Sequence, residues 1–82
     1  MNNYSVKNED IQEVFKMWGE IFIFQKKYYN APKQNDTKEN KNKFWDEFIA
    51  ESERIVRKYD TKLCSAIMVA ITDDISERSK SQ

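Results

Sequence analysis

The chain contains no histidine, and its 82 residues include one cysteine, one glycine and one proline. Without histidine, the Ser-His and Cys-His nucleophile pairs, histidine acid–base catalysis and histidine-containing metal sites are excluded. A single cysteine, Cys64, excludes an internal disulfide and every zinc site built from several cysteines. A single glycine, Gly19, excludes the glycine-rich loops that cradle phosphates. These absences predict a protein that is not an enzyme and that uses no metal ion or cofactor.

The chain also lacks an excess of charge and a long apolar run. Its 14 basic and 14 acidic residues balance, so no overall field draws it to nucleic acid or to an acidic membrane. The longest apolar stretch, Leu63–Ile71, is interrupted by Ser65 and has about half the 18 residues that span a bilayer. Residues 1–4 form no basic start followed by an apolar leader. We therefore expect a cytoplasmic protein without a membrane segment.

The scarcity of turn residues favours an all-α fold, because β folds and doubly wound α/β folds need frequent glycine and proline. We predict a three-helix bundle with helices at about 9–29, 38–59 and 61–78 and a polar loop at 31–37. Residues 1–82 are expected to form one domain, with flexible ends at 1–7 and 79–82. The competing interpretation of the third segment is a buried strand over Ala66–Ile71, but no second strand is available to pair with it.

Capping residues set the expected boundaries. Asn8, followed by two acids, is a good N-cap for the first helix, and Pro32 prevents its continuation. Asp36 with Glu39 three positions later resembles a capping box for the second helix. Residues 59–61, Tyr-Asp-Thr, supply a break and a cap before the third helix.

The first helix carries the most informative pattern. At about 100° per residue, ten apolar side chains sweep roughly 180° of its circumference, interrupted only by Gln25. In angular order they are Phe24, Met17, Tyr28, Ile21, Val14, Trp18, Ile11, Tyr29, Phe22 and Phe15. A helix that docks on one core usually needs a stripe of about 100°. Two explanations stay open: generous packing with tyrosines at the rim, or a surface for a partner chain.

We expect a protein-binding function with Met17, Ile23 and Phe24 as contact residues. Met17 and Phe24 lie at the edge of the arc, and Ile23 is alone on the opposite face. Methionine and large aromatic residues are enriched in the cores of interfaces. The partner would be a second copy, giving a homodimer, or another protein whose identity the sequence does not reveal. The small side chains of Ala66 and Val69 offer an alternative interface on the third helix.

The alternative function is nucleic-acid contact through the lysine-rich segment 26–43. Six lysines stand there against two acids, and Tyr28 and Tyr29 beside them could stack on bases. The lysines are Lys26, Lys27, Lys33, Lys38, Lys41 and Lys43. Both tyrosines also belong to the apolar arc, and lysines without an arginine fork favour loose phosphate contact over base reading.

Other polar features have simpler interpretations. Cys64 falls on the apolar side of the third helix, where a free cysteine usually behaves as a small buried hydrophobic residue. The adjacent acids of residues 73–74 and 46–47 point about 100° apart on a helix and do not converge on one ion. Residues 58–61 have the length of a helix-turn-helix junction, but the helix that follows is too apolar to lie in a DNA groove.

A resemblance to a protein class rests on three short motifs: Phe44-Trp45-x-x-Phe48, Arg57-Lys58-Tyr59 and Asp73-Asp74-x-x-x-Glu77-Arg78. With them the chain, over about residues 11–78, resembles small uncharacterised helical accessory proteins of phages and mobile elements of low-GC bacteria. An excess of lysine over arginine, 11 to 3, fits such AT-rich genomes. The resemblance implies no catalytic residues. It implies an adaptor, a transcriptional helper, or an inhibitor that redirects a host or defence protein, and a toxin or antitoxin partner is not separable from these.

Overall fold

Three helices account for most of the chain in the computed structural model, which describes residues 6–80 apart from the side chain of Asp10. They are α1 (Asn8–Lys27), α2 (Lys38–Tyr59) and α3 (Lys62–Lys80). Each helix packs against both others, so the predicted three-helix bundle is confirmed. The segment Ala66–Ile71 is helical throughout, and the strand interpretation is wrong.

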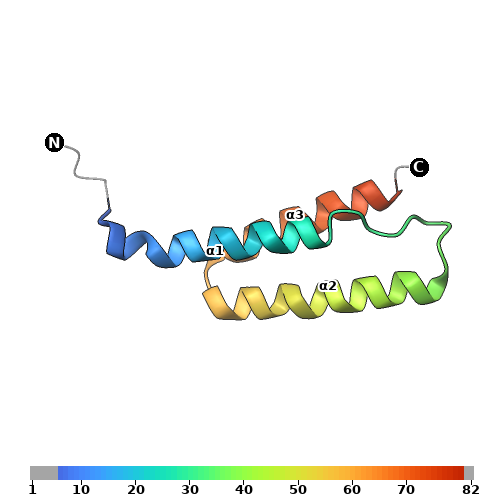
Figure 1. Ribbon diagram of the computed structural model, residues 1–82, viewed down its shortest axis with the longest axis horizontal. Coiled ribbons are helices and arrows are strands. Elements are labelled where there is room, and N and C mark those ends of the chain that lie inside the picture. Colours follow the sequence, from blue (N-terminus) through green and yellow to red (C-terminus); the bar gives the residue numbers. More distant parts are fainter. Residues whose placement is uncertain (1–5, 81–82) are drawn as a thin grey trace.

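The bundle is elongated, with extents of 56 × 22 × 18 Å. Helices α1 and α3 run in the same direction (Figure 1). Helix α2 is antiparallel to both and leads from the end of α1 back to the start of α3 (Figure 1). The first turns of α1 project beyond the connection between α2 and α3 (Figure 1). Among the described residues, neither α2 nor α3 extends alongside this end of α1.

The helix ends differ from the prediction by a few residues. Helix α1 ends at Lys27, because the backbone of Tyr28 turns away (φ −106°, ψ 15°) while its N–H still donates to the carbonyl of Phe24 at 3.1 Å. Helix α3 continues to Lys80, and the hydroxyl of Ser79 donates to the carbonyl of Pro32 at 2.8 Å. Of the segments 1–7 and 79–82, which were predicted to be flexible, residues 1–5 and 81–82 lie outside the described residues, and residues 79–80 belong to α3.

Two of the predicted caps are shifted by one residue. The N-cap of α1 is Lys7 rather than Asn8, because the N–H of Ile11 already bonds to the Lys7 carbonyl at 3.2 Å. The N-cap of α2 is Thr37 rather than Asp36, because the Thr37 hydroxyl accepts the Asn40 N–H at 3.1 Å.

Around the second cap, Asp36 accepts bonds from the Thr37 N–H at 2.7 Å and from the Asn40 amide at 3.0 Å. The third cap matches the prediction. Asp60 adopts the left-handed conformation (φ 31°, ψ 53°), and the Thr61 hydroxyl accepts the Cys64 N–H at 3.0 Å.

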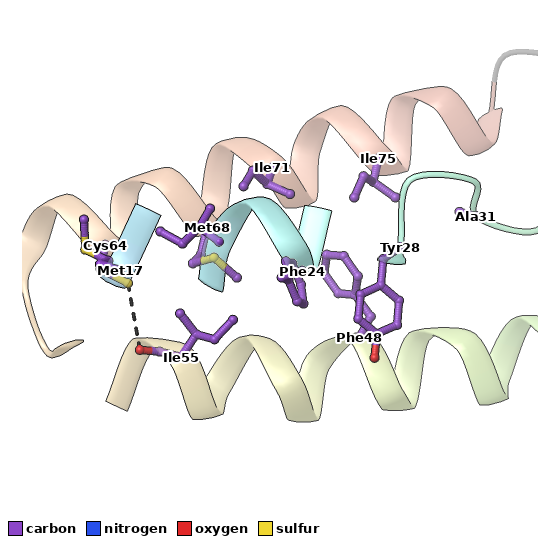
Figure 2. Packing of buried hydrophobic residues seen from close by; sticks show 11 residues of the cluster. Met17, Phe24, Tyr28, Ala31, Phe48, Ile55, Cys64, Met68, Ile71 and Ile75 are labelled. Atoms are coloured by element: carbon purple, nitrogen blue, oxygen red, sulfur yellow. Dashed lines mark hydrogen bonds between the residues drawn. The ribbon is translucent and has the colours of Figure 1, made fainter. Parts of the chain in front are cut away.

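The core runs along the line where the three helices meet (Figure 2). Its buried members are Met17, Ile21, Phe24, Tyr28, Ala31, Phe48, Ile55, Cys64, Met68, Ile71 and Ile75. Near the end of α1, the rings of Phe24, Tyr28 and Phe48 pack with centroids 4.9–5.4 Å apart, close to the preferred spacing of tilted aromatic pairs. Cys64 is fully buried and its thiol contacts the Ile55 carbonyl at 3.9 Å, which confirms its place in the core.

Candidate protein-binding face

The apolar arc of α1 is divided between the core and the surface. Its first half in angular order, Phe24, Met17, Tyr28 and Ile21, is buried, with Val14 half-buried beside it. The second half is exposed. It comprises Trp18, Ile11, Tyr29, Phe22 and Phe15, and we call these five residues the aromatic face. The bundle therefore uses only one side of an arc about twice as wide as a single core needs.

The aromatic face is unusually exposed for such large side chains. The exposed fraction is 78% for Phe15, 65% for Phe22 and 48% for Trp18. With about 200 Å² for each large side chain, the five residues together expose about 500 Å². A contiguous apolar patch on a monomer is seldom larger than about 300–600 Å², and patches of this size often mark an interaction site.

The spacing of the face follows a coiled-coil seam. Ile11, Phe15, Trp18 and Phe22 are separated by four, three and four residues, so they form one row along α1 about 16 Å long. Tyr29 continues the row just after the helix ends. The same spacing applies to the buried row on the other half of the arc, so α1 carries two seams and the bundle fills one of them.

The C-terminal part of α3 borders the aromatic face at Tyr29. The guanidinium of Arg78 lies 4.3 Å from the centre of the Tyr29 ring. On the same side of α3, Ile67 packs partly against the core and Leu63 is exposed. Between Ile67 and Arg78, the same side of α3 carries Asp74, which pairs with Arg78 at 2.9 Å.

On its opposite side, α1 is held to α2 by polar contacts. The carboxylate of Glu20 accepts bonds from Arg54 at 3.3 Å, from Lys58 at 2.7 Å and from the Tyr59 hydroxyl. These hydrogen bonds from Lys58 and Tyr59 lower the pKa of Glu20 to about 2. The cluster joins α1 to α2 beside the buried half of the arc.

A second polar contact lies at the end of α1. The hydroxyl of Tyr28 donates to the carboxylate of Glu51 at 2.9 Å, and Lys27 pairs with the same carboxylate at 3.0 Å. Burial of Tyr28 raises the pKa of its hydroxyl, and so does the bond to Glu51. These groups serve to join two helices, and Tyr28 stays in the core.

The projecting end of α1 adds a shallow hollow to the face. It is lined by Asn8, Ile11, Gln12, Phe15 and Lys16, all on α1. The hollow lies on the part of α1 that extends past the other helices (Figure 1). A partner that covers Phe15 and Trp18 would also reach this end.

The structure separates the three contact residues expected from the sequence. Met17 (4% exposed) and Phe24 (fully buried) lie in the core, so the expectation that they form a surface is wrong for this bundle. They sit where α2 and α3 close over α1. Ile23 is 63% exposed, yet it stands outside the row of the aromatic face. The pattern in the sequence that identifies the aromatic face is the four-three-four spacing of Ile11, Phe15, Trp18 and Phe22.

The alternative interface on α3 is exposed but offers little large apolar surface. Ala66 and Val69 are both exposed, and Val69 lines a shallow groove between α2 and α3 with Val56 and Met68. This groove contains one large exposed apolar side chain, Val69, whereas the face on α1 has several.

The lysine-rich segment does not form one platform with the tyrosines. Lys27 pairs with Glu51, and Lys41 donates to the Gln34 carbonyl at 2.9 Å. Tyr28 is buried, and Arg78 covers the Tyr29 ring. The four exposed lysines that remain are Lys26, Lys33, Lys38 and Lys43. Of the two tyrosines of the segment, only Tyr29 is exposed, and the guanidinium of Arg78 already stacks on its ring.

Among residues 6–80, no cluster of three or more cysteine or acidic side chains is arranged to hold a metal ion. None of the three described helices has the length and apolar content that crossing a membrane requires. Comparisons of the chain with protein-family models, with curated proteins and with solved structures found no significant match.

Proposed function

We propose that this protein is a non-enzymatic binding module whose aromatic face receives a protein surface. The observation that carries the proposal is the row Phe15, Trp18 and Phe22, which the bundle leaves uncovered along one side of α1. Large aromatic side chains supply most of the binding energy in interfaces when a partner excludes water from them. In an unpartnered chain the same row would promote aggregation.

The polar contacts of the bundle also support this role. The contacts of Glu20 with Arg54 and Lys58 fix α1 on α2, so the face is presented on a rigid helix rather than on a loop. A face held in place loses little conformational entropy when a partner binds. In the setting of a phage or mobile element, such a module would act by occupying a surface of a host or defence protein.

Site-specific photo-crosslinking in the cells that produce the protein tests the proposal. A photoreactive phenylalanine analogue replaces Phe15 or Phe22 in two variants, and Ile49 or Val69 in two control variants. All four positions are exposed, so the controls report random encounters on other faces. We expect discrete protein adducts from Phe15 and Phe22 and only diffuse background from Ile49 and Val69.

Equal labelling from all four positions, or no protein adduct from the aromatic face, would contradict the proposal. Helical circular dichroism of each variant provides the folding control. The mass of an adduct distinguishes a different protein from a second copy of the chain, and either one supports binding at the face.

A further inference from the structure

We infer that the partner of the aromatic face is a second copy of this chain, whose own α1 packs antiparallel across it about a two-fold axis near Trp18. The inference rests on the proposed binding role of the face and names the molecule that fills it. Three properties of α1 support it: the exposed area, the symmetry of the row and the distribution of charge.

The exposed area is close to what one subunit of a dimer needs. Stable interfaces bury about 800 Å² on each partner, and the aromatic face supplies about 500 Å² of this. The exposed Leu63 on α3 and the flanking Gln12 and Lys26 on α1 extend the surface on both sides. With these additions a helix of matching length covers the face without a larger partner.

The central part of the row, Phe15, Trp18 and Phe22, also matches itself when the helix is reversed. Phe15 stands three residues before Trp18, and Phe22 stands four residues after it. In an antiparallel pair centred between Trp18 and Gly19, Phe15 of one copy therefore meets Phe22 of the second copy, and the two Trp18 side chains meet near the axis. A self-complementary patch of this kind is what a two-fold dimer requires.

Charge along α1 favours the antiparallel orientation. Within α1, residues 8–20 carry a net charge of −3, and residues 21–27 carry a net charge of +2. Antiparallel packing places the acidic half of each helix beside the basic half of the other, whereas parallel packing places like charges together. Opposite potentials across an interface fix its orientation and disfavour the wrong register.

Gly19 would allow the α1 helices of the two copies to approach each other closely. A Cβ built on Gly19 would meet no atom within 4 Å, so nothing inside the bundle requires a glycine there. A glycine inside a helix lowers the stability of that helix. Beside Trp18, the missing side chain leaves room for the second helix to come near the axis.

Sedimentation equilibrium over a range of micromolar concentrations tests the dimer. We expect the mass to rise from 9.9 kDa toward twice that value with concentration. Phe22→Glu should raise the dissociation constant at least about tenfold, because it places a charge in the desolvated centre of the interface. Ile23→Glu is the matched control, since Ile23 is equally exposed on the same helix but outside the row, and it should leave the dissociation constant unchanged.

Chemical cross-linking through introduced cysteines tests the orientation. The native thiol of Cys64 is fully buried and does not compete for a maleimide reagent. With a short bis-maleimide, Gly19→Cys should cross-link to itself. Gln12→Cys should not cross-link to itself, but should cross-link to Lys26→Cys when the two variants are mixed.

Efficient cross-linking of Gln12→Cys to itself would overturn the antiparallel arrangement. A 9.9 kDa monomer at every concentration would overturn the dimer. In that case, photo-adducts from Phe15 and Phe22 to a different protein would leave the proposed binding function standing. An effect of Ile23→Glu as large as that of Phe22→Glu would show that association uses another surface.

Discussion

Glu20 is the residue on which three side chains of α2 converge, Arg54, Lys58 and Tyr59. Each of these donors favours the ionised carboxylate, so the pKa of Glu20 falls from 4.5 to about 2. A pKa that is lower in the folded state than in the unfolded state stabilises the fold above the unfolded pKa. This contribution is lost as the pH falls from about 4.5 through about 2.

Replacement of Glu20 should therefore change the acid stability. At neutral pH, Glu20→Gln should lower the free energy of unfolding by about 1–2 kcal/mol, an amount reduced by partial solvent exposure. The difference from the unsubstituted chain should shrink toward zero near pH 2. Urea denaturation at several pH values measures it, with the exposed Glu47→Gln as control. A difference that stays constant from pH 7 to pH 2 would exclude this role of Glu20.

At the scale of single residues the sequence identified some environments and missed others. Cys64 was predictable as a core residue, because it falls on the apolar side of its own helix. Met17 and Phe24 were not, because a residue at the edge of an apolar arc can face either the core or a partner. An edge of an apolar arc becomes surface or core only when neighbouring helices are placed, and here α2 and α3 cover that edge.

At the scale of the helix, Gly19 weakens α1 without serving the bundle. It lies within the helix, and the space around its Cβ position is empty. Gly19→Ala should therefore raise the free energy of unfolding of the isolated chain by about 0.5–1 kcal/mol.

Chemical denaturation at a protein concentration too low for association measures the effect of Gly19→Ala. Ala50→Gly provides the reverse control, because Ala50 is an exposed residue in the middle of α2. A loss of stability in Gly19→Ala would mean that the helix is strained or crowded at this position, contrary to the structure.

The helices themselves were largely predictable from the sequence. Residues 38–59 form α2 as predicted, because a polar loop precedes them and Asp60 ends them in a left-handed conformation. The end of α1 was placed too late, since Tyr28 has the apolar character of the helix but turns inward to pack on Phe48. Periodicity identifies the apolar side of a helix but does not detect this turn, which depends on tertiary packing.

At the scale of the whole molecule, the arrangement of α2 and α3 decides which seam of α1 becomes core. Both rows of α1 have the same spacing and similar apolar content, so the sequence alone gives no reason to prefer one. Glu20 and Lys27, which pair with residues of α2, lie on the side of α1 next to the first row. The aromatic face thus results from the assembly of three helices. In the sequence it was visible only because the apolar arc of α1 is wider than one core needs.

The central claim is that α1 has one seam in the core and one left for a partner. Matched substitutions of Phe24 and Phe15 on the same helix test it most directly, with urea denaturation at a concentration too low for association. Phe24→Ala should lower the free energy of unfolding by about 3–5 kcal/mol or leave the chain unfolded, because it opens a cavity among Tyr28 and Phe48. Phe15→Ala should change it by less than about 0.5 kcal/mol. Equal losses at the two positions, or a larger loss at Phe15, would contradict the account.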